Sequence, residues 1–321
     1  MNAIRAAAAA LTAAAATVTA AALSCPAALA STTAAATIPL NCAASPHTCG
    51  YPDATSTGVP AGTTLKTVPA QVTSGTGWTY NPTQNTVEVS GDGVTLSGLK
   101  INCNLDISAD NVTINDVQVT ASGNFGISLR HTSGVTIENS AIAGQNTTTG
   151  RVGAAITDVY GDSAGMTIKN NNISAFKTGI QVSTGTITGN YLHDPGYVPG
   201  DHTNGIFDAG TTQPLSITGN TILNSLGQTD AISLDASAAG SAISNKTVQG
   251  NLIGGGGYSI YGGASLSNTT SSILIENNRF AQAYYPASGQ YGPVSYYNSA
   301  DPGNTWTGNI WDTTGATIPA P

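Results

Sequence analysis

The stretch Ile187-Thr-Gly-Asn190-Tyr-Leu192 decides the fold, because similar stretches recur along the chain. In each copy an apolar residue is followed three positions later by a key residue, and two positions further on by a second apolar residue. The key residue is asparagine in six copies, at Asn171, Asn190, Asn220, Asn251, Asn278 and Asn309. Three earlier copies carry Leu99, Val117 and Ser140. Intervals of 18 to 31 residues between these positions predict nine turns of one coil.

A second strand motif recurs in most intervals. It consists of a small residue, an isoleucine and, often, an apolar residue two positions later. The isoleucines are Ile127, Ile156, Ile180, Ile206, Ile232 and Ile260. Short strands whose inward apolar residues stack from coil to coil are typical of a parallel β-solenoid. We expect these isoleucines to form one buried ladder, and the asparagine to lie in a turn between strands, where it tolerates left-handed dihedrals.

The composition also indicates strands. Only 8% of the 321 residues are charged and 38 are glycine, and helices tolerate glycine poorly. A β-sandwich also has many short strands, but it does not require the same asparagine at coil-length intervals. We expect the solenoid over residues 92–321, with a C-terminal cap rich in tyrosine, at Tyr284, Tyr285, Tyr291, Tyr296 and Tyr297. The alternative is that these rings form a platform on which sugars stack.

Residues 1–30 have the pattern of a secretory signal peptide. A weakly basic start precedes the alanine-rich run Ala6–Leu23, and Ala28-Leu29-Ala30 has the small-x-small form of a cleavage site. The alternatives are a membrane span and a lipoprotein modified at Cys25, but the run is mostly alanine and no basic flank follows it. Residues 31–91 then form an N-terminal leader and cap, because the end of a solenoid must be covered.

The exported chain is acidic. Removal of Arg5 with the leader leaves eight basic residues against seventeen acidic ones, which excludes nucleic acid as a partner. Cys42 and Cys49 are seven residues apart, and we expect a disulfide between them in an oxidising compartment. Cys103 is interpreted as a small buried residue. We expect a secreted monomer without a membrane span.

Ionisable residues are scarce, so one loop that gathers them is informative. It contains His193, Asp194, Asp201 and His202. Histidine beside carboxylate is the pairing that general acid–base catalysis uses. The alternative interpretation is that the aspartates and prolines of this loop only shape a turn.

The repeat register places residues of neighbouring coils beside this loop. Equivalent positions lie roughly 5 Å apart along the coil axis. We therefore expect one groove edge to be lined by Arg151, Lys177, Asp201, His202, Asn204 and Asp230. Phe207 and Tyr261 lie one residue past the inward isoleucine of their coils, where their rings can stack on sugars.

At this point the sequence resembles the right-handed parallel β-helix proteins of the pectate-lyase-like superfamily, particularly a group of secreted bacterial members. The resemblance covers the chain from about Cys49 on. It rests on the segments Cys49-Gly-Tyr-Pro-Asp-Ala-Thr55, Asn111-Val-Thr-Ile114, Gly200-Asp-His-Thr-Asn-Gly-Ile206 and Gly308-Asn-Ile-Trp-Asp-Thr-Thr-Gly315. It implies an all-β, right-handed parallel β-helix that acts on an extracellular polysaccharide.

Proteins of this superfamily cleave polysaccharides in such a groove, and β-elimination of a uronate is the chemistry that we favour. His202 or Lys177 would remove the proton, Arg151 would neutralise the substrate carboxylate, and Asp201 would orient His202. Substrate contacts would come from Asn204, Asp230, Phe207, Tyr261, His193 and Asp194.

Two other functions stay open. In hydrolysis Asp201, Asp208 and Asp230 would serve as acid and base, but the Asn-Thr-Asp, Asp-Asp, Gly-His-Gly and Arg-Ile-Lys series of polygalacturonase-like hydrolases is missing. Asp208 and Asp230 suit Ca²⁺ equally well. Related loops often end His-Thr-Asp-Gly-Ile, where this chain has Asn204, so a non-catalytic carbohydrate- or surface-binding solenoid is the alternative. An ice-binding solenoid requires regular Thr-x-Thr ladders, against which the irregular insertions argue.

Overall fold

The computed structural model describes one compact unit of this chain. The predicted signal peptide and the start of the predicted leader lie outside the described residues, which are 40–145, 151–235, 240–264 and 268–321. Within these ranges the only helices are two short 3-10 turns, η1 (Cys42–Ala44) and η2 (Pro46–Cys49). Neither is long and apolar enough to cross a membrane.

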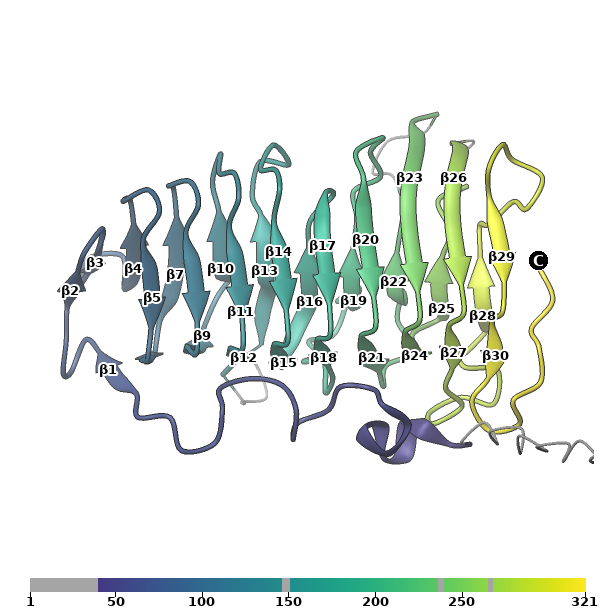
Figure 1. Cartoon of the computed structure of the whole chain (residues 1–321), viewed down its shortest axis with the longest axis horizontal. Coiled ribbons are helices and arrows are strands. Elements are labelled where there is room, and N and C mark those ends of the chain that lie inside the picture. The colour runs from purple at the N-terminus through teal and green to yellow at the C-terminus, as the bar shows by residue number, and fades with distance from the viewer. Residues whose placement is uncertain (1–39, 146–150, 236–239, 265–267) are drawn as a thin grey trace, which may run out of the picture. The chain divides into compact units, whose positions relative to one another are not determined.

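Three sheets run the length of the solenoid, and their strands repeat coil after coil (Figure 1). The first has ten parallel strands, one of them directly at or after each of the nine key positions of the repeat. Its members are β1 (Lys66–Val68), β6 (Leu99–Ile101), β9 (Gln118–Ala121), β12 (Ala141–Gly144), β15 (Asn172–Ser174), β18 (Tyr191–Leu192), β21 (Thr221–Asn224), β24 (Leu252–Gly255), β27 (Arg279–Phe280) and β30 (Ile310–Trp311).

The second sheet has eleven strands and contains the second strand motif. Its members are β2 (Ser74–Gly75), β3 (Trp78–Asn81), β4 (Thr86–Val89), β7 (Asn104–Ile107), β10 (Phe125–Leu129), β13 (Val152–Asp158), β16 (Phe176–Gln181), β19 (Asn204–Phe207), β22 (Asp230–Ser233), β25 (Tyr258–Tyr261) and β28 (Gly292–Ser295). The predicted isoleucine ladder is confirmed, because all six side chains are fully buried and pair in register from β10 to β25. Only the hairpin pairings β2–β3 and β3–β4 are antiparallel.

A third sheet, which the two-strand reading of the repeat did not include, completes each coil. Its nine strands are β5 (Thr95–Ser97), β8 (Thr113–Asn115), β11 (Thr136–Glu138), β14 (Thr167–Lys169), β17 (Gly185–Thr188), β20 (Leu215–Thr218), β23 (Ala242–Gln249), β26 (Thr269–Glu276) and β29 (Thr305–Thr307). The repeated six-residue motif crosses a corner. Its first apolar residue lies in this sheet and its last in the ten-stranded sheet. The predicted parallel β-helix is confirmed.

The key asparagines form a hydrogen-bonded ladder inside that corner. Asn220 is fully buried, its backbone N–H donates to Oδ1 of Asn251 over 2.9 Å, and its Nδ2 donates to the carbonyl oxygen of Ile187 over 3.0 Å. The left-handed residue, however, is the one before the asparagine, as at Gly219 (φ 61°) and Asn170 (φ 55°). The asparagine therefore satisfies buried backbone groups, and its neighbour makes the turn.

Residues 41–66, which we call the strap, run back beside the coils from β30 to β1 (Figure 1). The N–H of Asn41 donates to the carbonyl oxygen of Asp312 over 2.9 Å, and the N–H of Gly58 donates to that of Asn170 over 2.9 Å. At its other end β1 pairs with β6. The predicted leader thus holds the last coil as well as the first.

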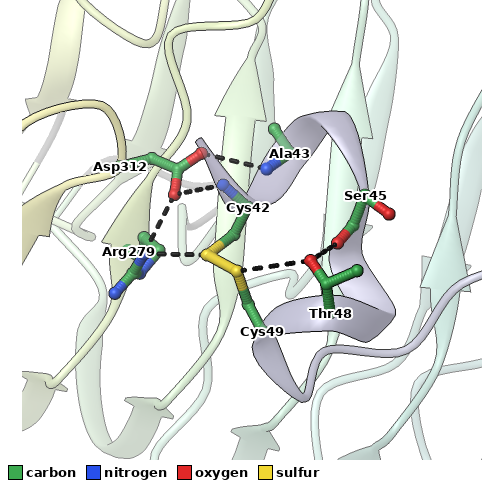
Figure 2. The surroundings of a disulfide bond; sticks show 7 residues. All are labelled: Cys42, Ala43, Ser45, Thr48, Cys49, Arg279 and Asp312. Carbon is green, nitrogen blue, oxygen red and sulfur yellow. Dashed lines mark hydrogen bonds and ion pairs between the residues drawn. A yellow bond between two sulfur atoms is a disulfide. The ribbon is translucent and has the colours of Figure 1, made fainter. Parts of the chain in front are cut away.

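A disulfide fixes the start of the strap, as predicted, between Cys42 and Cys49 (Figure 2). The Asp312 carboxylate accepts the N–H groups of Cys42 and Ala43, each over 2.9 Å. Arg279 contacts the same carboxylate at 3.2 Å and donates to Sγ of Cys42 over 2.8 Å. Each group is buried or nearly so, so this clasp is a fully connected polar network.

Candidate functional site

The loop between β18 and β19 is anchored by an ion pair to the residue just before β13, two coils earlier. Nε and Nη2 of Arg151 donate to the two carboxylate oxygens of Asp201, each over 2.7 Å, and the N–H of Val198 donates to the same group over 3.0 Å. These bonds to Arg151 lower the pKa of Asp201. The register correctly predicted that Arg151 and Asp201 lie together. Their charges neutralise each other, so Asp201 orients Arg151 in this structure, not His202.

Of the two predicted bases, Lys177 lies between the members of this pair in the chain and His202 directly follows Asp201. His202 is exposed, and no hydrogen bond of its ring is found among the described residues. Lys177 is half-buried in β16, and its charge also contributes to the lowered pKa of Asp201. Because Asp201 neutralises Arg151, Lys177 is the cation beside this loop for which no ion pair is found among the described residues.

His193 has a structural environment. Its ring stacks on Tyr191 with centroids 4.1 Å apart, Nδ1 lies 2.8 Å from Oδ2 of Asp194, and Nε2 lies 2.9 Å from Oδ1 of Asn172. Both ring nitrogens are thus engaged and the side chain is only 18% exposed. His193 and Asp194 shape the start of the loop, and neither is free to act on a substrate proton in this arrangement.

Asn204, Asp230 and Tyr258 occupy one column of the eleven-stranded sheet, as the register predicted for the first two. Asp230 is fully buried, and neither carboxylate oxygen has a hydrogen-bond partner among the residues that the structure describes. Burial raises its pKa well above the usual range, and the nearby charge of Asp235 raises it further. Burial therefore favours the protonated form of the Asp230 carboxyl. It lies close to Tyr261, whose pKa is raised by burial and by that carboxyl.

The two carboxylates named for calcium do not fit such a site. Asp208 is fully buried in an ion pair with Lys246, at 2.9 Å from its Nζ. Asp230 is fully buried, and its burial disfavours the ionised form that a cation would need. Among the described residues no group of three or more His, Cys, Asp or Glu side chains is gathered as metal ligands. Calcium dependence stays a prediction.

Aromatic rings form a continuous surface beside the Asp230 column. The ring centroids of Tyr258 and Tyr261 are 5.8 Å apart, those of Tyr258 and Tyr291 5.9 Å, and those of Tyr261 and Tyr296 5.4 Å. Tyr291 is 66% exposed and Tyr296 52%, while the other two are half-buried. Phe207 pairs in register with Ser233, which pairs with Tyr261. We call the five aromatic residues Phe207, Tyr258, Tyr261, Tyr291 and Tyr296 the aromatic face.

Three members of the aromatic face were not predicted as site residues. Tyr291 and Tyr296 had been assigned to a cap, whereas Tyr297 alone of these three is buried, against Trp306. Tyr258 was not singled out, although Tyr258-Ser-Ile-Tyr261 repeats the register of Asn204-Gly-Ile-Phe207. Applying that register to every copy of the motif would have found it.

The family model described as "Right handed beta helix region" matches residues 105–316, well over half of the chain. The chain belongs to this family. None of the curated proteins compared with this right-handed β-helix chain matches it. Among solved structures, it is similar to the catalytic unit of a thermostable GH87 alpha-1,3-glucanase from Streptomyces thermodiastaticus strain HF3-3, with 17% identity and a TM-score of 0.39. That similarity covers 73% of this chain and 52% of the glucanase chain, so this chain spans about half of that one. A likeness at this level says nothing about what this β-helix binds or cleaves.

Proposed function

We propose that this right-handed β-helix is an extracellular, monomeric protein that binds a polysaccharide along its aromatic face. The main support for this proposal is that the rings of Tyr291, Tyr258, Tyr261 and Tyr296 contact one another in that order. Sugar rings have apolar faces that pack on aromatic rings, while a phenol hydroxyl remains available for hydrogen bonds. The Cys42–Cys49 disulfide supports an oxidising compartment.

The position of the rings favours a polymer over a small sugar. Phe207 and Tyr261 lie two coils apart, with Ser233 between them, and Tyr296 follows the strand of the next coil, at roughly 4.8 Å per coil. A glycan chain that crosses the coils would meet one ring after another, and the gains of adjacent contacts would combine as in other multivalent binding. An isolated ring would give no such preference for length.

Lyase-type cleavage is the second candidate, and the edge formed by Lys177 and His202 supports it. Both lie on the coils that precede the tyrosine-bearing ones, so a chain bound to the rings can extend over them. In this reaction Lys177 or His202 would accept the C5 proton of a uronate unit, the leaving-group oxygen would depart, and a 4,5-unsaturated product would form. Arg151 would contribute only if a substrate carboxylate displaced Asp201.

Binding is tested by affinity electrophoresis and by pull-down with insoluble polysaccharides. Tyr261→Ala and Tyr296→Ala should each weaken retention about fivefold, since one stacked ring contributes about 1 kcal/mol. Tyr80→Ala, which removes a ring from the N-terminal hairpin, is the matched control and should bind like the wild type. Equal binding by all three variants would refute the aromatic face.

Cleavage needs a separate assay. Uronate-containing glycans that bind are followed at 235 nm for unsaturated ends, with and without a chelator. Removing a general base should lower the rate by about two to four orders of magnitude. If binding occurs without new absorbance, or if Lys177→Ala and His202→Ala both keep full turnover, the lyase candidate is wrong and the binding proposal stands.

A further inference from the structure

The exposed ring of Tyr160, at the turn after β13, is held in place by its neighbours. Tyr160 stacks on the ring of His131, with centroids 4.2 Å apart and planes 4° from parallel. Nδ1 of His131 lies 2.6 Å from Oδ2 of Asp162. Tyr160 nevertheless remains 56% exposed. One face of its ring is therefore covered by histidine, and most of the remainder faces solvent.

A second ion pair fixes the same ring from its hydroxyl end. Nη1 of Arg130 donates to the hydroxyl oxygen of Tyr160 over 3.4 Å, and the guanidinium carbon lies 5.9 Å from the ring centroid. Nε of Arg130 donates to both carboxylate oxygens of Asp106, over 2.6 and 2.8 Å. Exposed ion pairs of this kind contribute little to stability. Their effect here is to hold an exposed ring in one orientation, which lowers the entropy lost when a ligand binds.

A hollow of about 210 Å³ lies directly beside this ring. It is lined by Tyr160 together with Gln181, Ser183 and Ala209. Gln181 pairs in register with Phe207, so the hollow opens next to the first ring of the aromatic face. The Gln181 amide is half-buried, and no hydrogen bond of its side chain is found among the described residues. It offers both a donor and an acceptor to a ligand in the hollow.

We propose that Tyr160 and this hollow form a further subsite for the glycan of the aromatic face, and that the unit bound there is a neutral sugar. The inference rests on the proposed function and adds the class of sugar. The ring would stack on the apolar face of the sugar, and Gln181 would hydrogen-bond its hydroxyl groups.

Charge argues for a neutral unit. The carboxylates near the hollow already have partners: Asp106 pairs with Arg130, Asp162 with His131, and Asp208 with Lys246. The Asp158 carboxylate accepts the N–H groups of Gly161 and Ser163. A uronate would bring a further anion beside these groups, and each cation named here would have to leave its carboxylate to pair with it.

The subsite adds length to the bound chain. From the coil of Tyr160 to that of Tyr261 there are four steps, through β16, β19, β22 and β25, or about 19 Å. An oligosaccharide that spans this distance can engage both rings, whereas a disaccharide engages one. Loss of Tyr160 should therefore weaken the binding of long chains and leave that of short ones almost unchanged.

Calorimetric titration of the full chain with disaccharides and octasaccharides tests this. The probes are the gluco-, manno- and xylo-oligosaccharides, with oligogalacturonides as the charged series. For the neutral series that binds, Tyr160→Ala should raise the octasaccharide Kd about tenfold and the disaccharide Kd less than twofold. Tyr160→Phe keeps the ring and should bind within about twofold of wild type. Asp162→Ala frees His131 without removing the ring, so an intermediate loss supports the positioning role.

Each result distinguishes the two proposals. If Tyr261→Ala weakens binding and Tyr160→Ala does not, the further subsite is refuted while the aromatic face stands. If oligogalacturonides alone bind and Tyr160→Ala weakens them, the neutral class is wrong. If no glycan binds the wild-type chain, both proposals fail. Circular dichroism of each variant confirms that the fold is retained.

Discussion

Asp230 has no partner for its carboxyl group although it lies in the middle of a sheet. It is fully buried, and this burial and the nearby charge of Asp235 both raise its pKa. Because its pKa in the folded chain is raised above the unfolded value, the native state binds more protons than the unfolded state between those two values. The free energy of unfolding therefore falls as the pH rises through this window.

Replacing this carboxyl by an amide should remove that penalty. Asp230→Asn keeps the shape but cannot ionise, so at pH 7 it should raise the free energy of unfolding by about 1 kcal/mol, the usual size of a single-site effect. Below the ordinary pKa of aspartate, near pH 3, the two proteins should be equally stable. Urea unfolding at pH 3, 5 and 7 measures the difference, and Asp235→Asn is the matched control for the neighbouring charge. A variant less stable than wild type at pH 7 would show that the ionised form has a stabilising partner.

Residue contacts were predictable only where both partners lie in one column. The register placed Arg151 beside Asp201 and Asn204 beside Asp230, and both placements are confirmed. The repeat register did not predict the pairing of Asp208 with Lys246, since Lys246 lies in β23, which belongs to a different sheet. These two buried charges meet because the chain closes into a coil, and a pattern along the sequence does not predict which residues meet across that coil.

The asparagine ladder is the element that couples one coil to the next. In the central copy Asn220 donates to Ile187 and accepts the N–H of Asn190, while its own N–H donates to Asn251. Replacing it by alanine would leave a buried carbonyl and a buried N–H without partners, and each such group costs about 1–3 kcal/mol.

Asn220→Ala should therefore lower the free energy of unfolding by about 2–4 kcal/mol, measured in urea. Asn124→Ala replaces an exposed asparagine for whose side chain no hydrogen bond is found within the described ranges, and it should change stability by less than about 0.5 kcal/mol. If the two variants were equally stable, the ladder would be a consequence of the fold and not a cause of its stability.

The ladder also shows what the sequence could predict of the elements. A repeated asparagine before a repeated apolar residue was sufficient to predict the parallel fold. The third strand was missed because its outward residues, such as Thr136, Thr167 and Thr186, precede the six-residue motif and had no separate signal. The aromatic face was found only in part, since two of its four tyrosines, Tyr291 and Tyr296, come from a segment that resembles a cap in composition.

At the scale of the whole molecule, the strap joins coils that are far apart in the sequence. The Asp312 carboxylate of the last turn holds Cys42 and Ala43, and β1 pairs with the first coil. A solenoid otherwise has contacts only between neighbouring coils, and its stability is a sum of such local terms. A segment that contacts both ends adds contacts of a different kind, because its release would uncover several coils together.

Opening the clasp should release the strap without unfolding the coils. Cys42→Ser with Cys49→Ser removes a short closed loop, which by chain entropy alone costs about 2–3 kcal/mol. Hydrogen exchange should then rise at Asn41 and Gly58, whose N–H groups donate to Asp312 and Asn170 in the wild type, and stay unchanged in the isoleucine ladder. Asp312→Ala, which keeps the disulfide but removes the acceptor of Cys42 and Ala43, should give the same pattern. Dithiothreitol should reproduce it in the wild type and have no further effect on the double variant. If exchange rose equally in the strap and in the central coils, the clasp would hold the whole solenoid and not the strap alone.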